Sequence, residues 1–449
     1  MTTPILDFVR GYAESGTARF HMPGHKGEGL LGPEPWDLTE IRGADVLYRA
    51  EGIIRESEEQ AAALFGAGRT VYSAEGSSQC IRAMICLACL RAREEGIPAR
   101  LLAARNAHKA LMYAAAALDA EIDWLEGDDG EESYLACRIT PETVRRALAA
   151  RPYMGVYLTS PDYLGCMQDV AGIAGVCREY GVPLLVDNAH GAYLRFLAED
   201  RHPMTLGAAM CCDSAHKTLD CLTGAAYLHL SREAADRWGE AAEQAMALFG
   251  STSPSYLILA SLDRMNRELA GDWPRRLRRT AERLEALKTR LAGRGWRMTG
   301  EEPMKLTLCA ASGGYTGDGL HDELRRHGIE GEFSDPEFMT LMPSPRTGEE
   351  AWRRLERTLE AIPRRQEIRP AVPKPGKGER VCSIRQAMLS PRETVAAEES
   401  IGRILADACV SCPPAVPILM AGERVTEQAI ACFRHYGIQR LTVIRNDSL

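Results

Sequence analysis

The sequence predicts an α/β protein with a mainly parallel seven-stranded sheet, followed by a small α+β domain and a C-terminal module. Between about residues 68 and 230, short apolar runs alternate with helical patterns, the order found in parallel sheets covered by helices. The runs are continuously apolar, as expected of strands buried on both faces. A proline-rich, charged stretch at residues 363–380 then sets the tail apart.

Seven apolar runs are expected to form the strands of the sheet: Thr70–Ser73, Leu101–Ala104, Ile122–Leu125, Gly155–Leu158, Pro183–Val186, Ala208–Cys212 and Ala225–Leu230. Parallel strands need long crossover connections, which are usually helical. Helical patterns occur between most of these runs, at Ser77–Arg93, Lys109–Leu118, Pro141–Ala150 and Val170–Tyr180.

Beyond the sheet, residues 253–270 predict a helix and residues 272–296 a long amphipathic one. Short strand-like runs and one helix alternate from there to residue 342, and another helix is expected at residues 348–361. We therefore divide the chain into an N-terminal arm (1–60), a large domain (61–270), a small α+β domain (271–365), a linker (366–381) and a C-terminal module (382–449).

The composition is that of a soluble globular protein. The 449 residues are 45% hydrophobic and 26% charged, and no apolar run is long enough to span a membrane. The first residues lack the pattern of an export signal, so we expect a cytoplasmic protein. A net charge of −8 argues against nucleic acid as a partner.

Two of the cysteine pairs have the spacing of a metal clip, Cys86 with Cys89 and Cys409 with Cys412. The first pair lies on an apolar helical stretch, where free cysteine acts as a small core side chain. We expect neither a metal site nor a disulfide framework, because a large chain without an export signal is found in a reducing compartment.

Lys217, in "SAHKT", falls on a short connection between two expected buried strands. A lysine shielded from water has a lowered pKa, which makes the free amine a nucleophile. Imine formation with the aldehyde of pyridoxal phosphate is one chemistry that uses such an amine. This cofactor also requires a carboxylate, a flat group and phosphate donors, for which the sequence offers candidates.

A carboxylate is needed against the pyridine nitrogen, and Asp187 ends an apolar strand just before His190. Side chains at the carboxyl ends of parallel strands point into the crevice where ligands bind. Taken alone, an aspartate that opens a turn would be the more common explanation. A flat group is also needed over the ring, and His108 lies at a strand-to-helix junction, where histidine is usually a cap or a surface residue.

The phosphate requires donors, preferably at the start of a helix. In "EGSSQC", Gly76 allows close approach of the backbone, and Ser77 and Ser78 offer hydroxyl groups; an ordinary N-cap is the simpler alternative. Ser214 and His216, beside the lysine, provide a second set of donors. Each of these groups follows a strand of one sheet, and their combination is specific.

The segments "SAHKT", "VDNAHGAYLRF", "RNAHKAL", "TSPDYLG" and "FHMPGHKG" resemble the ornithine/lysine/arginine decarboxylase family. The resemblance extends from about residue 20 to the end and is strongest between residues 73 and 224. It implies the aspartate-aminotransferase fold of pyridoxal-phosphate enzymes (fold type I) and pyridoxal 5'-phosphate as the cofactor. The chain lacks the long N-terminal wing of the large inducible members, so no assembly through such a wing is expected.

The resemblance implies a role for each of these residues. Lys217 would attach the cofactor, Asp187 would hold the pyridine nitrogen and His108 would stack on the ring, with His190 near the phenolic oxygen. The phosphate would be held by Ser77, Ser78, Ser214 and His216. Thr252 or Ser253 would reach the phosphate of a neighbouring subunit, which implies a homodimer with its active sites at the subunit interface; a helix N-cap is the alternative for Ser253.

The sequence departs from the commoner family forms at Gln79, Asn188 and Asp220. These residues neighbour the expected catalytic groups without replacing them. The departures therefore raise a question about geometry and rate, while the catalytic atoms themselves are retained.

The expected reaction is decarboxylation of a basic amino acid, with Lys217 or His216 returning a proton to the α-carbon. An aminotransferase uses the same lysine and aspartate, so it remains the alternative, with Arg346 as a candidate carboxylate clamp. A non-catalytic relative that binds the cofactor is the third possibility. The acidic residues Glu330, Glu332 and Asp335 are candidate partners for the distal cation of lysine, ornithine or arginine; a solvated turn is equally compatible with them.

Overall fold

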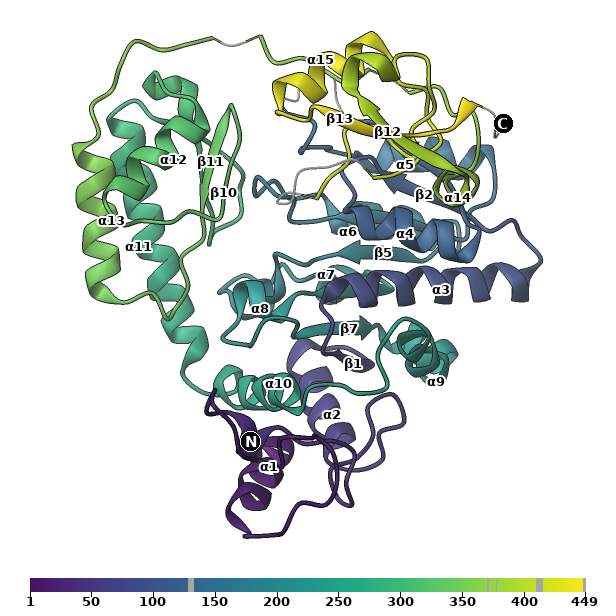
Figure 1. The fold of residues 1–449 in the computed structure, drawn as a ribbon, viewed down its shortest axis with the longest axis vertical. Coiled ribbons are helices and arrows are strands. Elements are labelled where there is room, and N and C mark those ends of the chain that lie inside the picture. Colours follow the sequence, from purple (N-terminus) through teal and green to yellow (C-terminus); the bar gives the residue numbers. More distant parts are fainter. Residues whose placement is uncertain (128–132, 370, 377, 409–414, 447–449) are drawn as a thin grey trace. The chain divides into compact units, whose positions relative to one another are not determined.

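The computed structural model describes residues 1–127, 133–369, 371–376, 378–408 and 415–446. These residues form two compact units (Figure 1). The first contains Met1–Ala99, Pro141–Ser160 and Asp169–Arg276, and the second contains Arg100–Thr140, Pro161–Gln168 and Leu277–Leu449. The five-part division made from the sequence is finer and stays a prediction.

The main sheet has seven strands in the order β1-β7-β6-β5-β4-β2-β3, which confirms the predicted fold class. The pairs β2/β3, β4/β5 and β5/β6 are parallel, whereas β7 is antiparallel to both β1 and β6. The strands are β1 (Arg69–Ser73), β2 (Arg100–Ala104), β3 (Glu121–Leu125), β4 (Gly155–Thr159), β5 (Leu184–Asp187), β6 (Met210–Asp213) and β7 (Ala226–Leu230).

One predicted strand begins two residues too early. The run 208–212 was expected to be extended from its first residue, but Gly207 ends the short helix α7 (Pro203–Leu206) with a φ of 97°. The amide of Ala208 then bonds to the carbonyl of Pro203, so that this residue closes the helix. Strand β6 therefore starts at Met210.

The helices of the first unit follow the sequence prediction closely. Helix α3 (Ser77–Glu95) begins at the expected serine, after Gly76 has turned the chain with a φ of 77°. It packs against β7 and against α9 (Arg232–Leu248) (Figure 1). The others are α1 (Pro4–Glu14), η1 (Glu34–Trp36), α2 (Ile53–Phe65), α5 (Pro141–Ala150), α6 (Val170–Glu179), η2 (Ala192–Phe196), α8 (Ala215–Thr218) and α10 (Tyr256–Leu269).

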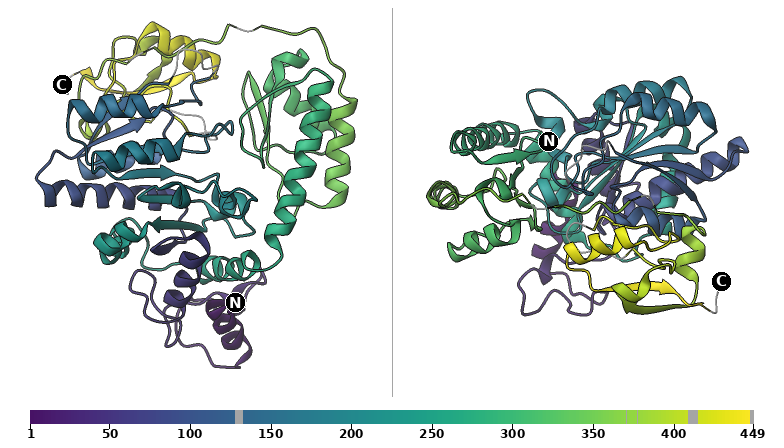
Figure 2. Two further views of the ribbon diagram at one scale, coloured as in Figure 1. Left: turned by 180° about the vertical axis from the view of Figure 1, so that it is seen from behind. Right: turned by 90° about the horizontal axis from the view of Figure 1, so that it is seen from above.

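The second unit contains a four-stranded antiparallel sheet in the order β10-β11-β9-β8; Figure 2 shows, in green, the helices that lie beside it. Leucines of α11, α12 and α13, with Trp352 of α13, pack against this sheet in one buried cluster. The elements are α11 (Trp273–Gly293), which begins in the first unit, β8 (Arg297–Thr299), β9 (Leu306–Cys309), η3 (Ala310–Gly313), α12 (Gly317–Arg326), β10 (Phe333–Ser334), β11 (Phe338–Leu341) and α13 (Glu349–Ala361).

The tail has its own small core, in which Leu419, Phe433 and Leu441 are fully buried. Its elements are α14 (Ile384–Leu389), β12 (Arg392–Ala396), η4 (Ala397–Ser400), α15 (Glu427–His435) and β13 (Arg440–Ile444), and β12 pairs antiparallel with β13. Helix α4 (Lys109–Leu118) also belongs to the second unit. Among the described helices, none is both long enough and apolar enough to cross a lipid bilayer.

Candidate active site

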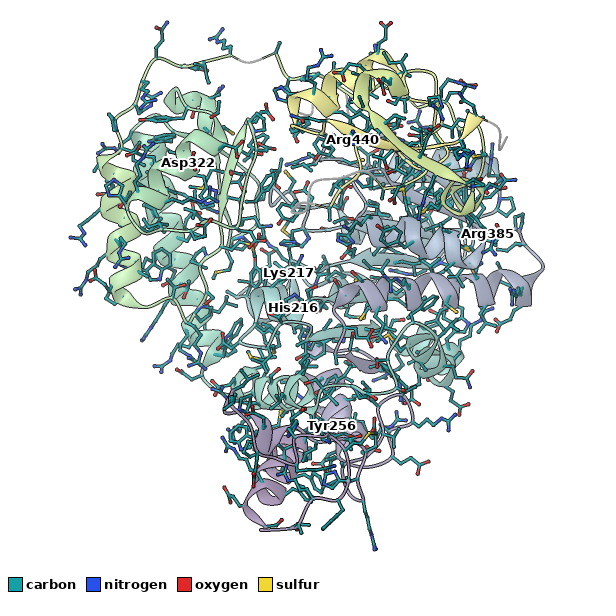
Figure 3. All side chains as sticks on the ribbon, viewed as in Figure 1. His216, Lys217, Tyr256, Asp322, Arg385 and Arg440 are labelled. Carbon is teal, nitrogen blue, oxygen red and sulfur yellow. The ribbon has the colours of Figure 1, made fainter. Side chains whose placement is uncertain are left out.

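Two neighbouring strands of the first unit end in chemically active side chains. Asp187 is the last residue of β5, and it lies opposite Cys212 of β6 in parallel register. Ser214 follows β6 directly, and the single-turn helix α8 carries His216 and Lys217 (Figure 3). The carboxyl end of this part of the sheet therefore gathers residues that are far apart in the sequence.

The amine of Lys217 lies beside a histidine. Its Nζ is 3.0 Å from Nε2 of His190, and the His190 side chain is buried. Lys217 itself is exposed in the single chain. The expectation that its amine is shielded from water is therefore wrong for the single chain. Helix α8 is too short to bury both faces, and only Ala215 at its start is enclosed.

Asp187 is a buried carboxylate, with 2% of its surface exposed. Its Oδ2 accepts a hydrogen bond from the hydroxyl of Tyr157 at 3.2 Å, and its Oδ1 accepts from the amide of Ala189 at 3.1 Å. The second bond is the turn-opening contact that the simpler explanation predicted. A carboxylate has about four acceptor sites, so these contacts still leave capacity for a ring nitrogen.

Two serines from distant segments meet at the start of α3. The hydroxyl of Ser214 donates to the hydroxyl of Ser77 at 2.7 Å across 137 residues of sequence. The capping position is occupied by Gly76 without any side-chain cap, so the interpretation of these serines as an N-cap is wrong. The first turn of this 19-residue helix presents amide donors beside the serine pair, with Ser78 in the same turn, and donors of this kind at the start of a helix suit an anion.

Three other predicted residues have local contacts. The ring Nδ1 of His216 lies 3.0 Å from the carbonyl of Ala225 and therefore carries the proton. His108, in the second unit, caps α4 through an acceptor bond from the amide of Ala110 at 3.1 Å. Ser253 is not a helix cap, since Ser255 occupies the capping position of α10. Ring stacking by His108 and a phosphate contact by Ser253 stay predictions.

The sequence prediction missed two threonines at this end of the sheet. Thr159 ends β4 opposite Asp187, and Thr218 follows Lys217. Among the described residues, their Oγ1 atoms have no hydrogen-bond partner although both are buried. Unsatisfied buried hydroxyls are uncommon in folded proteins and indicate a polar ligand. Together with the serines, Asp187 and Lys217, they fit a phosphorylated pyridine aldehyde.

A second missed feature is a fully buried carboxylate, Asp213 at the end of β6. Its Oδ2 lies 2.9 Å from Nε2 of His202 and 3.3 Å from Nε2 of His229. Its Oδ1 accepts a hydrogen bond from the side-chain amide, Nδ2, of Asn188 at 2.6 Å. Burial would raise the pKa of Asp213, but the two histidines outweigh this effect and hold it well below its usual range.

His202, Asp213 and Cys211 are close enough in space to surround a metal ion. However, Nδ1 of His202 accepts the amide proton of Met204, which places the ring proton on Nε2, facing Asp213. The histidine is then a hydrogen-bond donor instead of a ligand. The pair Cys86 and Cys89 lies on α3, with Cys89 buried against Met154, and Cys409 and Cys412 lie outside the described residues.

The residues at which the sequence departs from the family pattern fit their surroundings. The buried side chain of Gln79 bonds to the hydroxyls of Ser73 and Tyr48 and to the carbonyl of Met246. Asn188 is the donor to Asp213. Asp220 is half-buried in the turn after α8, so none of the three displaces a predicted catalytic side chain.

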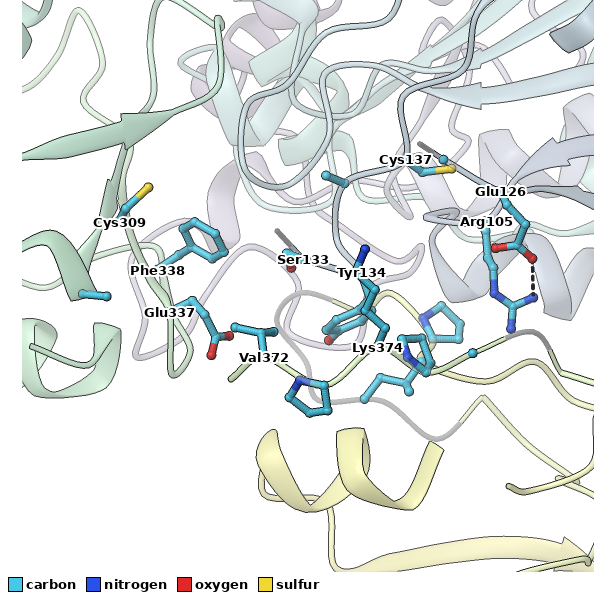
Figure 4. Close-up of a pocket in the computed structure, with 18 of the residues that line it drawn as sticks. Arg105, Glu126, Ser133, Tyr134, Cys137, Cys309, Glu337, Phe338, Val372 and Lys374 are labelled. Atoms are coloured by element: carbon cyan, nitrogen blue, oxygen red, sulfur yellow. Dashed lines mark ion pairs between the residues drawn. The ribbon is translucent and has the colours of Figure 1, made fainter. Parts of the chain in front are cut away.

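A cavity of about 510 Å³ lies within the second unit (Figure 4). Its wall includes Tyr134, Glu337 and Phe338, together with an ion pair between Arg105 and Glu126. It contains none of the residues predicted to bind the cofactor. A cavity without those groups is a weaker candidate for the reaction than the end of the sheet described above.

The predicted acidic partners of a basic substrate lie in this second unit, and each already has a protein partner. Glu330 forms an ion pair with Arg325, and Glu332 accepts from the hydroxyl of Tyr163. Asp335 is buried and accepts from the amides of Glu337 and Phe338. Burial and the nearby Glu337 raise the pKa of Asp335 to about 7. Arg346, the alternative carboxylate clamp, is exposed in a turn.

Comparison with known proteins identifies related chains. Residues 3–308 match the major domain of Orn/Lys/Arg decarboxylase. The chain is 29% identical to the uncharacterized protein YaaO and 28% identical to an arginine decarboxylase, both of Bacillus subtilis, over 96% of this chain and 93% and 92% of theirs. An arginine decarboxylase of Halalkalibacterium halodurans is 29% identical over 96% of this chain and 93% of its own.

Solved structures share the fold. The constitutive lysine decarboxylase of E. coli superposes with a TM-score of 0.76 at 19% identity, covering 99% of this chain and 82% of that one. Lysine decarboxylase A of Pseudomonas aeruginosa gives 0.77 at 18%, covering 98% and 80%. An alanine–glyoxylate aminotransferase of Nostoc superposes over 68% of this chain and 85% of its own with a TM-score of 0.53 at 19% identity.

Proposed function

The chain belongs to the Orn/Lys/Arg decarboxylase family, and on this premise we propose that it uses pyridoxal 5'-phosphate to decarboxylate a basic amino acid. The observation that supports this proposal best is the group formed by Lys217, His190 and Asp187 with the Ser77–Ser214 pair, all within the first unit. An amine, a ring partner and an anion site are the parts that this cofactor requires.

The cofactor supplies an aldehyde that bonds to amines and a ring that takes up the electron pair left when carbon dioxide departs. Asp187, a buried carboxylate at the end of β5, would keep the ring nitrogen protonated by its opposite charge. The serine pair and the first turn of α3 would bind the phosphate. His108 would stack on the ring, as the resemblance implies.

The amine of Lys217 would be the group that holds the cofactor. Its Nζ, beside Nε2 of His190, would be placed to return a proton to the α-carbon after carbon dioxide has left, which would give the amine with one carboxyl group fewer. His216 is the second candidate for this proton transfer. The orientation of the bond that breaks distinguishes this reaction from transamination, which uses the same groups.

We propose arginine as the substrate to test first, because the relatives that align along nearly their whole length include chains named arginine decarboxylase. The experiment is to assay arginine, lysine and ornithine for carbon dioxide, amine and keto acid. Carbon dioxide and amine from a basic amino acid support the proposal. Keto acid without carbon dioxide would make the protein an aminotransferase, and bound cofactor without any product would make it a non-catalytic relative.

We also propose that the protein is a homodimer with its active sites at the subunit interface. Four large apolar side chains of the N-terminal segment are exposed in the single chain: Phe20 (97%), Met22 (68%), Leu30 (103%) and Leu31 (85%). Exposed apolar side chains of this size in one segment of 12 residues are typical of a surface that contacts a partner. The segment is held in place locally by bonds from His21 to Tyr12 and from His25 to Asp37, as a preformed binding surface requires.

A further inference from the structure

We propose that Asp213 is a positioning residue that holds the loop of His190 and the loop of Lys217 in one fixed relation. Its carboxylate lies at the end of β6 and is fully buried. Asp213 is four residues before Lys217, and Asn188, its hydrogen-bond partner, is two residues before His190. The inference rests on the proposed function, because it assigns Asp213 a role in arranging the same site.

Two histidines face one oxygen of the carboxylate, and His202 makes a hydrogen bond to it. Nδ1 of His202 accepts from a backbone amide, so its Nε2 carries the proton that is donated to Oδ2. Nδ1 of His229 lies 2.8 Å from the hydroxyl of Thr70, which leaves its Nε2 to face the same oxygen. Burial lowers the pKa of His229 and favours its neutral form.

The ring of Phe65 holds both histidines in place. Its centroid is 4.5 Å from that of His229 and 5.3 Å from that of His202. Because these rings are packed and buried, neither imidazole can follow the carboxylate if it moves. The position of Oδ2 is therefore fixed by β7 and by the segment before α7.

The other oxygen connects the two strand ends. Oδ1 accepts from Nδ2 of Asn188, and the amide of Asn188 donates in turn to the carbonyl of Cys212 at 3.0 Å. Asn188 follows Asp187 directly, so the contact also fixes the end of β5. The 3.0 Å separation between His190 and Lys217 thus depends on a carboxylate that contacts neither of them.

The charge of Asp213 also affects the pKa of neighbouring thiols. After burial, it is the largest contribution to the raised pKa of Cys80 and of Cys211. The carboxylate is fully buried, in surroundings that exclude water, where removing a donor or the charge leaves other polar groups without partners. Small changes at this position are expected to move both loops.

Asp213→Asn tests the proposal because the asparagine side chain keeps the shape of the carboxylate but presents an N–H group to the donors that now bond to Asp213. In the purified holoenzyme we expect kcat to fall at least tenfold with KM changed less than threefold. We also expect the pH midpoint of the absorbance change of the bound cofactor to shift by more than half a unit. Asp236→Asn, an exposed carboxylate on α9, is the control and should change neither quantity.

Asn188→Ala and His229→Gln are two further variants. They take the place of Asp213→Asn if that variant does not fold. Asn188→Ala should shift the midpoint in the same direction, and combining it with Asp213→Asn should add little, because both remove the same link. A lower melting temperature with unchanged midpoint and unchanged kcat per bound cofactor would show a merely structural role and overturn the proposal. Additive effects of the two substitutions would overturn it as well.

Failure of the proposed function gives a different result. In that case the unsubstituted protein itself releases no carbon dioxide from any basic amino acid. The absorbance midpoint of its bound cofactor can still be measured, and the comparison between Asp213→Asn and Asp236→Asn then decides whether Asp213 positions the loops.

Discussion

The Nζ atom of Lys217 and the Nε2 atom of His190 lie 3.0 Å apart although 27 residues separate them in the sequence. Strands β5 and β6 are parallel neighbours, and each residue lies just beyond the end of one of them. The parallel pairing of these two strands therefore brings the two connections together. The first three predictions concern this contact and its immediate surroundings.

Replacing Lys217 by alanine should abolish turnover, with a loss of roughly a thousandfold or more, because no other group replaces a covalent nucleophile. Borohydride reduction followed by mass spectrometry should attach the cofactor to Lys217 in the unsubstituted protein and nowhere in the variant. Lys288→Ala, a lysine of α11, is the matched control and should retain both attachment and activity. Normal product formation by Lys217→Ala would contradict the proposed function.

Replacing His190 by asparagine removes the partner of the lysine amine. We expect kcat to fall on the order of a hundredfold, the scale of a lost proton-transfer partner, while the cofactor still attaches to Lys217. Steady-state kinetics with a mass measurement of the reduced enzyme checks both points. His435→Gln, on α15 of the second unit, is the control; equal effects in the two variants would argue against a specific role for His190.

Asp187→Asn and Tyr157→Phe form a graded pair. The first removes the charge that holds the ring nitrogen protonated, and we expect a loss in kcat of about a hundredfold or more. The second removes a single neutral hydrogen bond to the same carboxylate, which corresponds to about 1 kcal/mol and a fall of about fivefold. If Tyr157→Phe lowered kcat as much as Asp187→Asn does, the role of the carboxylate would have to be reconsidered.

Glu58 should make stability depend on pH. It is fully buried on α2, and burial raises its pKa to about 8, well above the usual value of 4.5. The folded state therefore binds more protons than the unfolded state between these values. Stability from the protonated form is complete below about pH 4.5 and is lost as pH rises through 8. Glu58→Gln should remove this pH-dependent loss in the free energy of unfolding, which is on the order of a few kcal/mol.

Urea unfolding at pH 5 and pH 9 measures this effect. The unsubstituted protein should lose stability between the two values, and Glu58→Gln should lose less. Glu59→Gln, an exposed neighbour on the same helix, should behave like the unsubstituted protein within about 0.5 kcal/mol. An identical pH response in all three proteins would place Glu58 in contact with water in solution.

Leu30→Ser combined with Leu31→Ser should weaken the proposed dimer. Each of these side chains is almost completely exposed in the single chain, so a partner would bury both of them, and each buried leucine contributes about 1.5–3 kcal/mol. Sedimentation velocity across a dilution series should show the monomer at higher concentration than in the unsubstituted protein. Leu389→Ser, an exposed leucine of α14, is the control, and equal dissociation of both variants would argue against this surface.

The fold could be predicted because its signals are local. All seven strands of the main sheet lie within two residues of their expected bounds, since most of them are short apolar runs between helices. The start of β6 was misplaced because alanines 208 and 209 are apolar whether they extend a strand or close a helix. Apolar character alone does not distinguish these two cases.

The candidate site was predicted only in part. Lys217, Asp187 and the two serines are polar residues at strand ends, and that pattern can be seen in the sequence. Asp213 was missed because its partners His202 and His229 lie 11 and 16 residues away, in different elements. The exposure of Lys217 was also missed, because solvent access depends on the tertiary surroundings of a one-turn helix.

The antiparallel placement of β7 has a consequence for biosynthesis. Strand β1 pairs only with β7 within the main sheet, and Gly76 donates its amide to the carbonyl of Gly224. A nascent chain that has emerged only as far as residue 220 therefore holds β1 without its neighbour, and Gly76, which precedes the serines of α3, without the carbonyl of Gly224. Pairing between strands that are so far apart in the sequence slows folding. We therefore expect the vitamin-derived cofactor to bind only after at least residue 230 has left the ribosome.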